Sequence, residues 1–187
     1  MPHIDAQDYL RLCEEAGTLY FLDIEATGLR GDYNSVLCVS FKPYGKKPFT
    51  LRVSQVGNDQ KVVREAAEVI ADEADIIAGY YSKGFDIPML NTRLLKWGHD
   101  PIPKTHHLDM YYTLKANLLT ARRSQGHLLS WLETPESKMT VGADIWSGMN
   151  LNFEKNMSIM VKRCESDVAG LEALYERTKH LIREIKR

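Results

Sequence analysis

The sequence predicts an α/β fold in which strands and amphipathic helices alternate. Three observations predict it: an almost continuously apolar segment near the start, two further β-rich segments joined by a Gly-Lys-Lys-Pro turn, and helical periodicity that alternates with short apolar runs from residue 59 onward. The resulting order is one helix, three strands, then helix, strand, helix, strand and a helical remainder, which is typical of a sheet covered by helices. No repeat or linker interrupts it, so residues 1–187 are expected to form one domain.

The chain is expected to begin with a helix that precedes the chemistry. Residues 5–16 place apolar side chains at helical spacing, with Asp5 as the N-cap and Gly17 as the residue that ends the helix. Residues 18–25 are β-rich and almost continuously apolar until two carboxylates appear, which is the pattern of a strand buried on both faces. We therefore expect residues 1–17 to form a helical extension and 18–25 to form a central strand.

The remaining elements follow from alternation and periodicity. Segments 35–44 and 49–53 alternate β-branched or aromatic residues with others, and the turn at 45–48 joins them, so the first three strands are expected to be antiparallel. The later elements are expected as a helix at 59–73, a strand at 75–80, a helix from 86 to 98, a strand at 106–108 and helices at about 109–119, 125–132 and 153–185, the last with a break near Cys164. A loop is expected near residues 133–145.

Composition restricts the classes of function. The chain is 44% apolar, 26% charged and 9% aromatic, which is ordinary for a globular protein. Its 24 Lys and Arg residues nearly balance 25 Asp and Glu residues, and the formal charge is −1. This balance excludes a protein that coats nucleic acid or an anionic membrane through its net charge, so a polyanionic ligand must be held by a local patch.

Targeting signals and cysteine chemistry are not evident. The first residues carry neither a basic nor an apolar signal region, and no apolar run approaches the roughly 18 residues of a membrane-spanning helix. A cytoplasmic protein without membrane contact is expected. The three cysteines, Cys13, Cys38 and Cys164, are odd in number and widely spaced, so we interpret them as buried apolar side chains rather than a disulfide framework or a zinc site.

Four acidic residues stand at unusual positions. Asp23 and Glu25 are two residues apart on the predicted central strand, so they point to the same face of a segment that otherwise belongs to the core. Burying two anions side by side is costly unless a cation shares them, so they indicate either a metal site or a strand end that meets solvent.

The other two acidic residues belong to predicted helices. Asp86 is the first residue of one helix, where it either caps the helix or points into a cleft. Asp167 lies beside the apolar stripe of the last helix, where a solvated acid is unusual.

Four segments together resemble the motifs of one nuclease family. They are DIEATGL at 23–29, GYYSKGFDIPMLNTRLL at 79–95, HLDMYYTLK at 107–115 and RCESDVAGLEALY at 163–175. In this order they are similar to the motifs of DEDD exonucleases of the ribonuclease H-like superfamily, especially small phage and bacterial ribonuclease H-like proteins related to the exonuclease domain of family B DNA polymerases. The resemblance covers residues 18–178 and implies a ribonuclease H-like fold, with a central mixed five-stranded sheet of three antiparallel strands followed by parallel strands, flanked by helices.

The resemblance also implies a metal-dependent active site. Carried over by position, it makes Asp23, Glu25, Asp86 and Asp167 the catalytic ligands of two divalent ions, Mg²⁺ or Mn²⁺, with Asp23 bridging both. The residue types agree with this chemistry, because these ions prefer hard oxygen ligands. A pair of ions can hold both the attacking and the leaving oxygen of an in-line displacement at phosphorus.

One departure from the family pattern concerns the residue that acts on the nucleophilic water, and another is Tyr81, where the family usually carries an asparagine. Where members carry a tyrosine four residues before the last aspartate, or a histidine five residues before it, this chain carries Arg163 and Lys162. The family residue orients or deprotonates the nucleophilic water, whereas a guanidinium stays protonated and a lysine beside carboxylates is held in its charged form. Arg163 and Lys162 are therefore candidates for an atypical base or for a phosphate contact. Because a metal itself acidifies bound water, slow but real hydrolysis is expected.

The resemblance further assigns contacts to the substrate. The backbone at Thr27 and Gly28 would approach the terminal nucleotide and Leu29 would stack on a base, although Gly28 taken alone indicates only a turn after a strand. Lys83 and Arg93 are the cations nearest Asp86 in the sequence among the candidate phosphate contacts. A solvated helix face is the alternative interpretation of these two residues.

Positive charge and tyrosines concentrate in one part of the chain. Between Lys83 and Arg123, seven Lys or Arg residues stand against three Asp residues. Four tyrosines lie next to or among these cations in the sequence, namely Tyr80, Tyr81, Tyr111 and Tyr112. Aromatic faces beside cations are typical of surfaces that stack nucleobases and contact phosphates.

The sequence and the resemblance together predict a two-metal 3′-to-5′ exonuclease that hydrolyses phosphodiester bonds at the 3′ end of single-stranded DNA or RNA. The polarity comes from the resemblance alone. A structure-selective endonuclease is the alternative enzyme, since the same carboxylates cut internally where a cleft is open. A nucleic-acid-binding pseudoenzyme is the alternative without catalysis.

Overall fold

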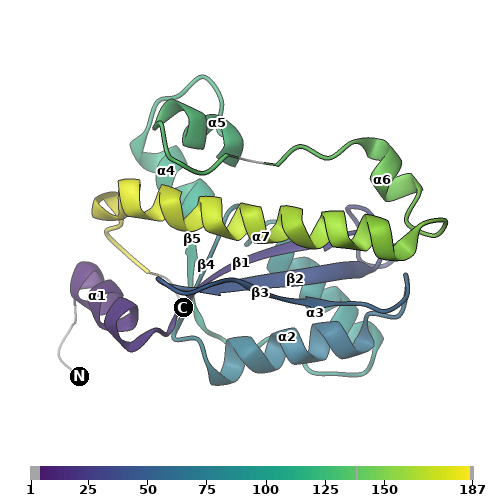
Figure 1. Ribbon diagram of the computed structural model, residues 1–187. Coiled ribbons are helices and arrows are strands. Elements are labelled where there is room, and N and C mark those ends of the chain that lie inside the picture. Colours follow the sequence, from purple (N-terminus) through teal and green to yellow (C-terminus); the bar gives the residue numbers. More distant parts are fainter. Residues whose placement is uncertain (1–4, 138, 186–187) are drawn as a thin grey trace.

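The computed structural model describes residues 5–137 and 139–185, and it confirms the predicted α/β fold with a mixed sheet between helices (Figure 1). The strands are β1 (Leu19–Ala26), β2 (Val36–Pro43), β3 (Phe49–Arg52), β4 (Ile76–Gly79) and β5 (His106–Asp109). They form one five-stranded sheet in the order β3-β2-β1-β4-β5. The central position expected for the first strand is therefore confirmed.

Antiparallel and parallel pairing meet at β1. β1 pairs with β2, and β2 with β3, in antiparallel fashion, and the predicted turn between β2 and β3 contains Gly45 with a φ of 69°. β1 pairs with β4, and β4 with β5, in parallel fashion. The parallel strands are those that follow a helix in the chain, because a parallel pair requires a crossover connection.

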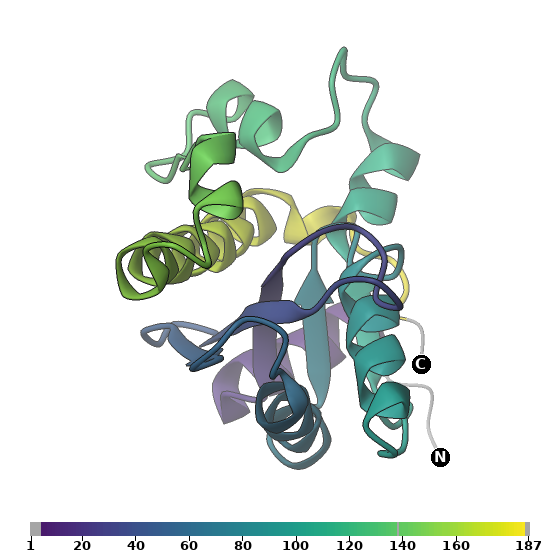
Figure 2. The same ribbon diagram turned by 90° about the vertical axis from the view of Figure 1, so that its right-hand side faces the viewer.

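Helices cover both faces of the sheet. They are α1 (Ala6–Ala16), α2 (Gln60–Asp72), α3 (Asp86–Lys96), α4 (Met110–Asn117), α5 (Gln125–Trp131), α6 (Ala143–Ser147) and α7 (Phe153–Thr178), followed by the 3₁₀ helix η1 (Lys179–Leu181). Figures 1 and 2 show α7 across one face of the sheet and α2 and α3 against the other. The predicted ends of α1 are confirmed: the Asp5 carboxylate accepts the N–H of Gln7 at 2.8 Å, and Gly17 has a φ of 73°.

Two expectations about the C-terminal half are wrong. The last helix runs without a break through Cys164 and ends at Thr178 rather than near residue 185. Gly170 does not interrupt it either, because a Cβ there would lie 2.9 Å from Leu129 of α5, so glycine lets the two helices approach closely. The short helix α6 starts at Ala143, close to the end of the loop expected near residues 133–145.

β1 divides its side chains between two cores. Even-numbered residues such as Leu22 pack in the core that contains side chains of α2 and α3. Odd-numbered residues such as Phe21 pack in the core that contains side chains of α7 and α5. Since alternate residues of a strand share a face, this pattern also turns Asp23 and Glu25 toward α7.

The cysteines serve as small core side chains, as predicted. Cys13, Cys38 and Cys164 are all buried and free. Burial raises the pKa of the Cys13 thiol, which keeps it protonated at neutral pH. Within the described part of the chain, none of the helices is long and apolar enough to cross a membrane.

A buried ion pair connects α3 to Asp59, the residue before α2. Arg93 is 2% exposed, and its Nε and Nη2 each donate to a different carboxylate oxygen of Asp59 at 2.8 Å. Asp59 also accepts the indole N–H of Trp97 at 2.8 Å and the N–H of Val36 at 2.9 Å. Arg93 Nη1 donates to the carbonyl of Gly31 at 3.0 Å. The expectation that Arg93 contacts phosphate is corrected, because its guanidinium is enclosed and bonded to protein acceptors.

Arg93→Gln is expected to lower the free energy of unfolding by about 3–5 kcal/mol, because it leaves the Asp59 carboxylate buried without its cation. Urea denaturation followed by circular dichroism measures this loss. Arg64→Gln is the matched control, since Arg64 and Glu68 form an exposed pair 2.7 Å apart whose contribution is about 0.5 kcal/mol or less. Equal losses in the two variants would contradict a structural role for Arg93.

Candidate active site

The four predicted carboxylates line one cleft of about 570 Å³. Asp23 and Glu25 lie on β1, Asp86 is the first residue of α3, and Asp167 lies within α7. Carboxylate oxygens of Asp23, Glu25 and Asp167 all lie within 4.8 Å of one another. Three elements that are distant in the chain therefore bring their acidic side chains to one place.

α7 fixes the position of Asp23 through a thiol. The Sγ of Cys164 donates to the backbone carbonyl of Asp23 at 3.2 Å and lies 3.4 Å from its Oδ2. Cys164 is three residues before Asp167, so one face of the helix presents both side chains to β1. Sequence reasoning treated Cys164 only as an apolar side chain, although its spacing from Asp167 was a usable signal.

Asp86 is buried against the backbone of β1 and is 4% exposed. Its Oδ1 accepts the N–H of Ile24, the residue between the two β1 carboxylates, at 3.2 Å. Burial is the largest cause that raises the pKa of Asp86 to about 7, and the charges of Asp109 and Glu25 raise it further, whereas the N–H groups of Asp86 and Ile24 lower it. A nearby cation would favour the charged carboxylate.

Arg163 lies inside the acidic cluster. Its Nε is 2.7 Å from Oε1 of Glu25 and 3.8 Å from Oδ2 of Asp167. The carbon at the centre of its guanidinium is 4.8 Å from the ring centre of Trp146 in α6, which is a cation–π distance. Arg163 is thus a counter-ion for two of the carboxylates. Sequence reasoning assigned no role to Trp146, because only the packing of α6 against α7 brings its ring to Arg163.

Lys162, the other candidate at this point of α7, is exposed and is not among the described residues that line the cleft. Adjacent residues of a helix point about 100° apart, so only one of the two side chains can face the carboxylates. The structure brings Arg163 to the cluster and leaves Lys162 on the solvent side.

The predicted nucleotide-contact segment forms the rim of the same cleft. Thr27, Gly28 and Leu29 all line it, and Leu29 is 79% exposed. A Cβ at Gly28 would lie 2.5 Å from Oδ1 of Asn34, so a larger residue there would displace the Asn34 side chain that packs against Gly28. Thr27 Oγ1 accepts the N–H of Ser35 at 3.0 Å, which holds the rim in place.

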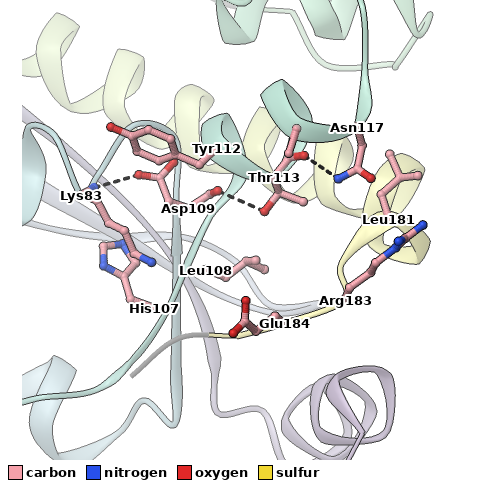
Figure 3. Close-up of a pocket in the computed structure, with 11 residues that line it drawn as sticks. Lys83, His107, Leu108, Asp109, Tyr112, Thr113, Asn117, Leu181, Arg183 and Glu184 are labelled. Carbon is pink, nitrogen blue, oxygen red and sulfur yellow. Dashed lines mark hydrogen bonds between the residues drawn. The ribbon is translucent and has the colours of Figure 1, made fainter.

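The structure places Lys83 outside this cleft. Its N–H donates to Oδ2 of Asp109 at 2.9 Å, and the N–H groups of Tyr81 and Tyr111 both donate to Oδ1 of Asp109 at 3.0 Å. Asp109 is therefore both the N-cap of α4 and the anchor of the turn at residues 81–83. The Lys83 side chain lines a neighbouring groove beside β5 (Figure 3).

Comparison with known proteins identifies the same architecture. Residues 20–138 match the family described as the RNase_H superfamily. No curated protein matches the chain. Among solved structures, the family B DNA polymerase from the hyperthermophilic archaeon Pyrobaculum calidifontis is similar, with a TM-score of 0.67, 15% sequence identity and coverage of 86% of this chain and 24% of the polymerase. At this identity the likeness shows the fold, and the chain spans about a quarter of the polymerase's length.

Proposed function

The chain belongs to the RNase H superfamily, and from this premise we propose that it is a metal-dependent 3′-to-5′ exonuclease acting on single-stranded DNA or RNA. The observation that carries the proposal is the set of four carboxylates that three separate elements bring to one cleft. Superfamily membership points to a nuclease with a nucleic acid substrate. The order of the motifs that resemble DEDD exonucleases supports the exonuclease type.

The donor set of the cleft fits Mg²⁺ or Mn²⁺. Asp23, Glu25, Asp86 and Asp167 offer only hard carboxylate oxygens, and neither a thiolate nor an imidazole is among the described residues that line the cleft. These four residues would hold two ions. When bound, the ions would neutralise the carboxylates, stabilise negative charge on the phosphate and make water more acidic.

Other side chains of the cleft bind and orient the substrate. Leu29 offers an exposed apolar surface at the rim, which suits stacking on the terminal base of any sequence. Arg163 stays protonated, so it does not take a proton from water. We assign it the role of a counter-ion that orients Glu25 and Asp167, with a planar fork that also suits a phosphate oxygen pair.

The test uses the purified chain with Mn²⁺ and 5′-labelled single-stranded DNA and RNA. We expect products that shorten by one nucleotide at a time from a free 3′ hydroxyl, slower cleavage when the 3′ end is phosphorylated, and no cleavage of a circular strand. Cutting of the circle would contradict the proposal and identify a structure-selective endonuclease. Binding of both substrates without cleavage would identify a nucleic-acid-binding pseudoenzyme.

Mn²⁺ is expected to raise the melting temperature of the chain. A ligand at a hundredfold excess over its Kd stabilises the native state by about 2.7 kcal/mol, which corresponds to roughly 5–10 °C for a chain of this size. Differential scanning calorimetry with Mn²⁺ and with EDTA at matched ionic strength measures the shift. Asp23→Asn should shift less, and an unchanged melting temperature in both proteins would contradict the metal site.

A further inference from the structure

A second and larger cleft lies beside the candidate active site, along the edge strand β5 (Figure 3). Its volume is about 770 Å³. Its lining includes Lys83, Tyr112, Thr113, Asn117 and Arg183. None of the four carboxylates that line the candidate active site, which we call the acidic cleft, belongs to this lining. We call this cleft the β5 groove. The proposed hydrolysis does not use it.

The two clefts share a wall of tyrosines. Tyr81 lines the acidic cleft and Tyr112 lines the β5 groove, with their ring centres 6.0 Å apart. Tyr111 packs edge-on against both, at 5.1 and 5.2 Å. Tyr81 is 46% exposed and Tyr112 is 44% exposed, so both present ring surface to solvent. A continuous aromatic surface therefore leads from the acidic cleft into the β5 groove.

The fold holds this wall in a fixed conformation. Buried Asp109 accepts the N–H groups of Tyr81, Lys83 and Tyr111. These bonds keep Tyr81 at a φ of 61°, which is uncommon for a residue with a Cβ. Strained backbone of this kind persists where surrounding bonds over-determine it, and it clusters at functional sites. The backbone that carries Tyr81, Lys83 and Tyr111 is thus held in place by Asp109 itself.

The charges of the β5 groove suit a single-stranded polyanion. Lys83 and Arg183 supply two cations, and Glu184 is one acid of the lining. The other acid, Asp109, is surrounded by the three N–H groups that it accepts. Burial is the main cause that lowers the pKa of His107 to about 4, so this side chain is neutral at pH 7. An aromatic face flanked by cations is the arrangement that binds unpaired nucleotides.

We propose that the β5 groove binds the single strand upstream of the cleaved bond, with a nucleobase stacked on Tyr112 and phosphates against Lys83 and Arg183. This inference rests on the proposed function. A 3′-to-5′ exonuclease leaves one nucleotide on the 3′ side of the cleaved bond, so a contact that extends beyond the acidic cleft belongs to the upstream strand. The substrate class is single-stranded nucleic acid several nucleotides long.

A third cleft of about 700 Å³, beside α5, is the competing route for this strand. Arg122 lines it, but Glu133 and Glu136 line it too, so its acidic side chains outnumber its arginine. No Tyr, Trp or Phe is among the described residues of that lining. It therefore lacks the stacking surface that the β5 groove offers, and its two acids face a single arginine, whereas the two acids of the β5 groove are matched by two cations.

Binding of 5′-labelled oligodeoxythymidylates of increasing length, measured by fluorescence anisotropy in EDTA, tests the proposal. We expect the affinity of the wild type to rise with length beyond a dinucleotide. Tyr112→Ala should weaken binding of a long strand about tenfold and leave the dinucleotide unchanged, because stacking one base contributes about 1–3 kcal/mol, or roughly 5- to 160-fold in affinity. Tyr112→Phe keeps the ring face and should bind like the wild type, which separates stacking on the ring from hydrogen bonding by the hydroxyl.

Salt dependence tests the phosphate contacts separately. Lys83→Gln and Arg183→Gln should each reduce the slope of log K against log salt concentration by about 0.7, the value for one phosphate contact on a single strand. Arg122→Gln is the matched control and should leave the slope unchanged. The proposal would be overturned if oligonucleotides of all lengths bound with equal affinity. It would also be overturned if the salt slope changed only in Arg122→Gln, because the strand would then bind in the third cleft.

Cleavage of the same oligonucleotides in Mn²⁺ distinguishes this inference from the proposed function. Cleavage by the wild type with a KM that does not change in Tyr112→Ala would overturn the groove and retain the exonuclease. Length-dependent binding that Tyr112→Ala abolishes, without cleavage by the wild type, would support the groove and contradict the exonuclease. Oligouridylates repeat both measurements for RNA.

Discussion

Asp23→Asn is expected to reduce the single-turnover rate of 3′-end cleavage by about 10³-fold. Asp23 lies in the cluster whose carboxylate oxygens are within 4.8 Å of one another, and an amide removes one negative charge from that donor set. Metal coordination contributes several kcal/mol to transition-state stabilisation, and each 1.36 kcal/mol is about tenfold in rate, so a loss of about 4 kcal/mol gives this size. Single-turnover assays with excess protein at saturating Mn²⁺ measure it.

Glu165→Gln is the matched control for this variant. Glu165 lies on α7 two residues before Asp167, and its Oε1 accepts the hydroxyl of Thr50 at 3.0 Å rather than lining the acidic cleft. The same change of one carboxylate to an amide should leave the rate close to that of the wild type. A similar loss in Glu165→Gln, or full activity in Asp23→Asn, would contradict the assignment of the cleft as the active site.

Arg163→Tyr is expected to raise the single-turnover rate by about 10²-fold. The change removes the guanidinium that pairs with Glu25 and Asp167, and it places a hydroxyl about one helical turn before Asp167. A positioned proton-transfer group contributes roughly 10²–10⁴-fold, and orientation of water alone gives the lower part of that range. The measurement uses saturating Mn²⁺, so that a change in metal affinity does not enter the rate.

Two further variants separate charge from hydroxyl. Arg163→Gln removes the charge without adding a hydroxyl. The Mn²⁺ concentration that gives half of the thermal shift should therefore fall about tenfold, which corresponds to about 1.4 kcal/mol of charge interaction. The cleavage rate should not rise. Arg163→Lys retains the charge. A slower Arg163→Tyr beside a partly active Arg163→Lys would assign Arg163 to the phosphate instead, and equal rates in all variants would place it outside the reaction.

Secondary structure and fold class were predictable because their signals act over a few residues. Asp5 and Gly17 bound α1 as expected, since capping depends on groups within one helical turn. The almost continuously apolar segment became the central strand, because a strand covered on both faces has no solvent side. The break expected near Cys164 does not occur. Packing of α7 against the sheet stabilises the helix there, and this tertiary contribution outweighs the helix propensity of the local sequence.

The direction in which charged side chains point could not be predicted from the sequence in the same way. Lys83 and Arg93 both lie within seven residues of Asp86, and both were expected to contact phosphate. Arg93 is instead buried against Asp59, and Lys83 lines the β5 groove on a turn that Asp109 anchors. The partner that decides each orientation is more than 20 residues away in the chain, and local spacing carries no information about it.

The sequence by itself determined the strands, most helix boundaries and the acidic residues of the candidate site, because periodicity, capping and residue chemistry are local properties. Only the tertiary structure decided that Cys164 contacts Asp23 across 141 residues, that Arg163 lies between Glu25 and Asp167, and that tyrosines join the acidic cleft to the β5 groove. These contacts depend on how α7 and α4 pack on the sheet, and that packing minimises the free energy of the whole core rather than of any one segment.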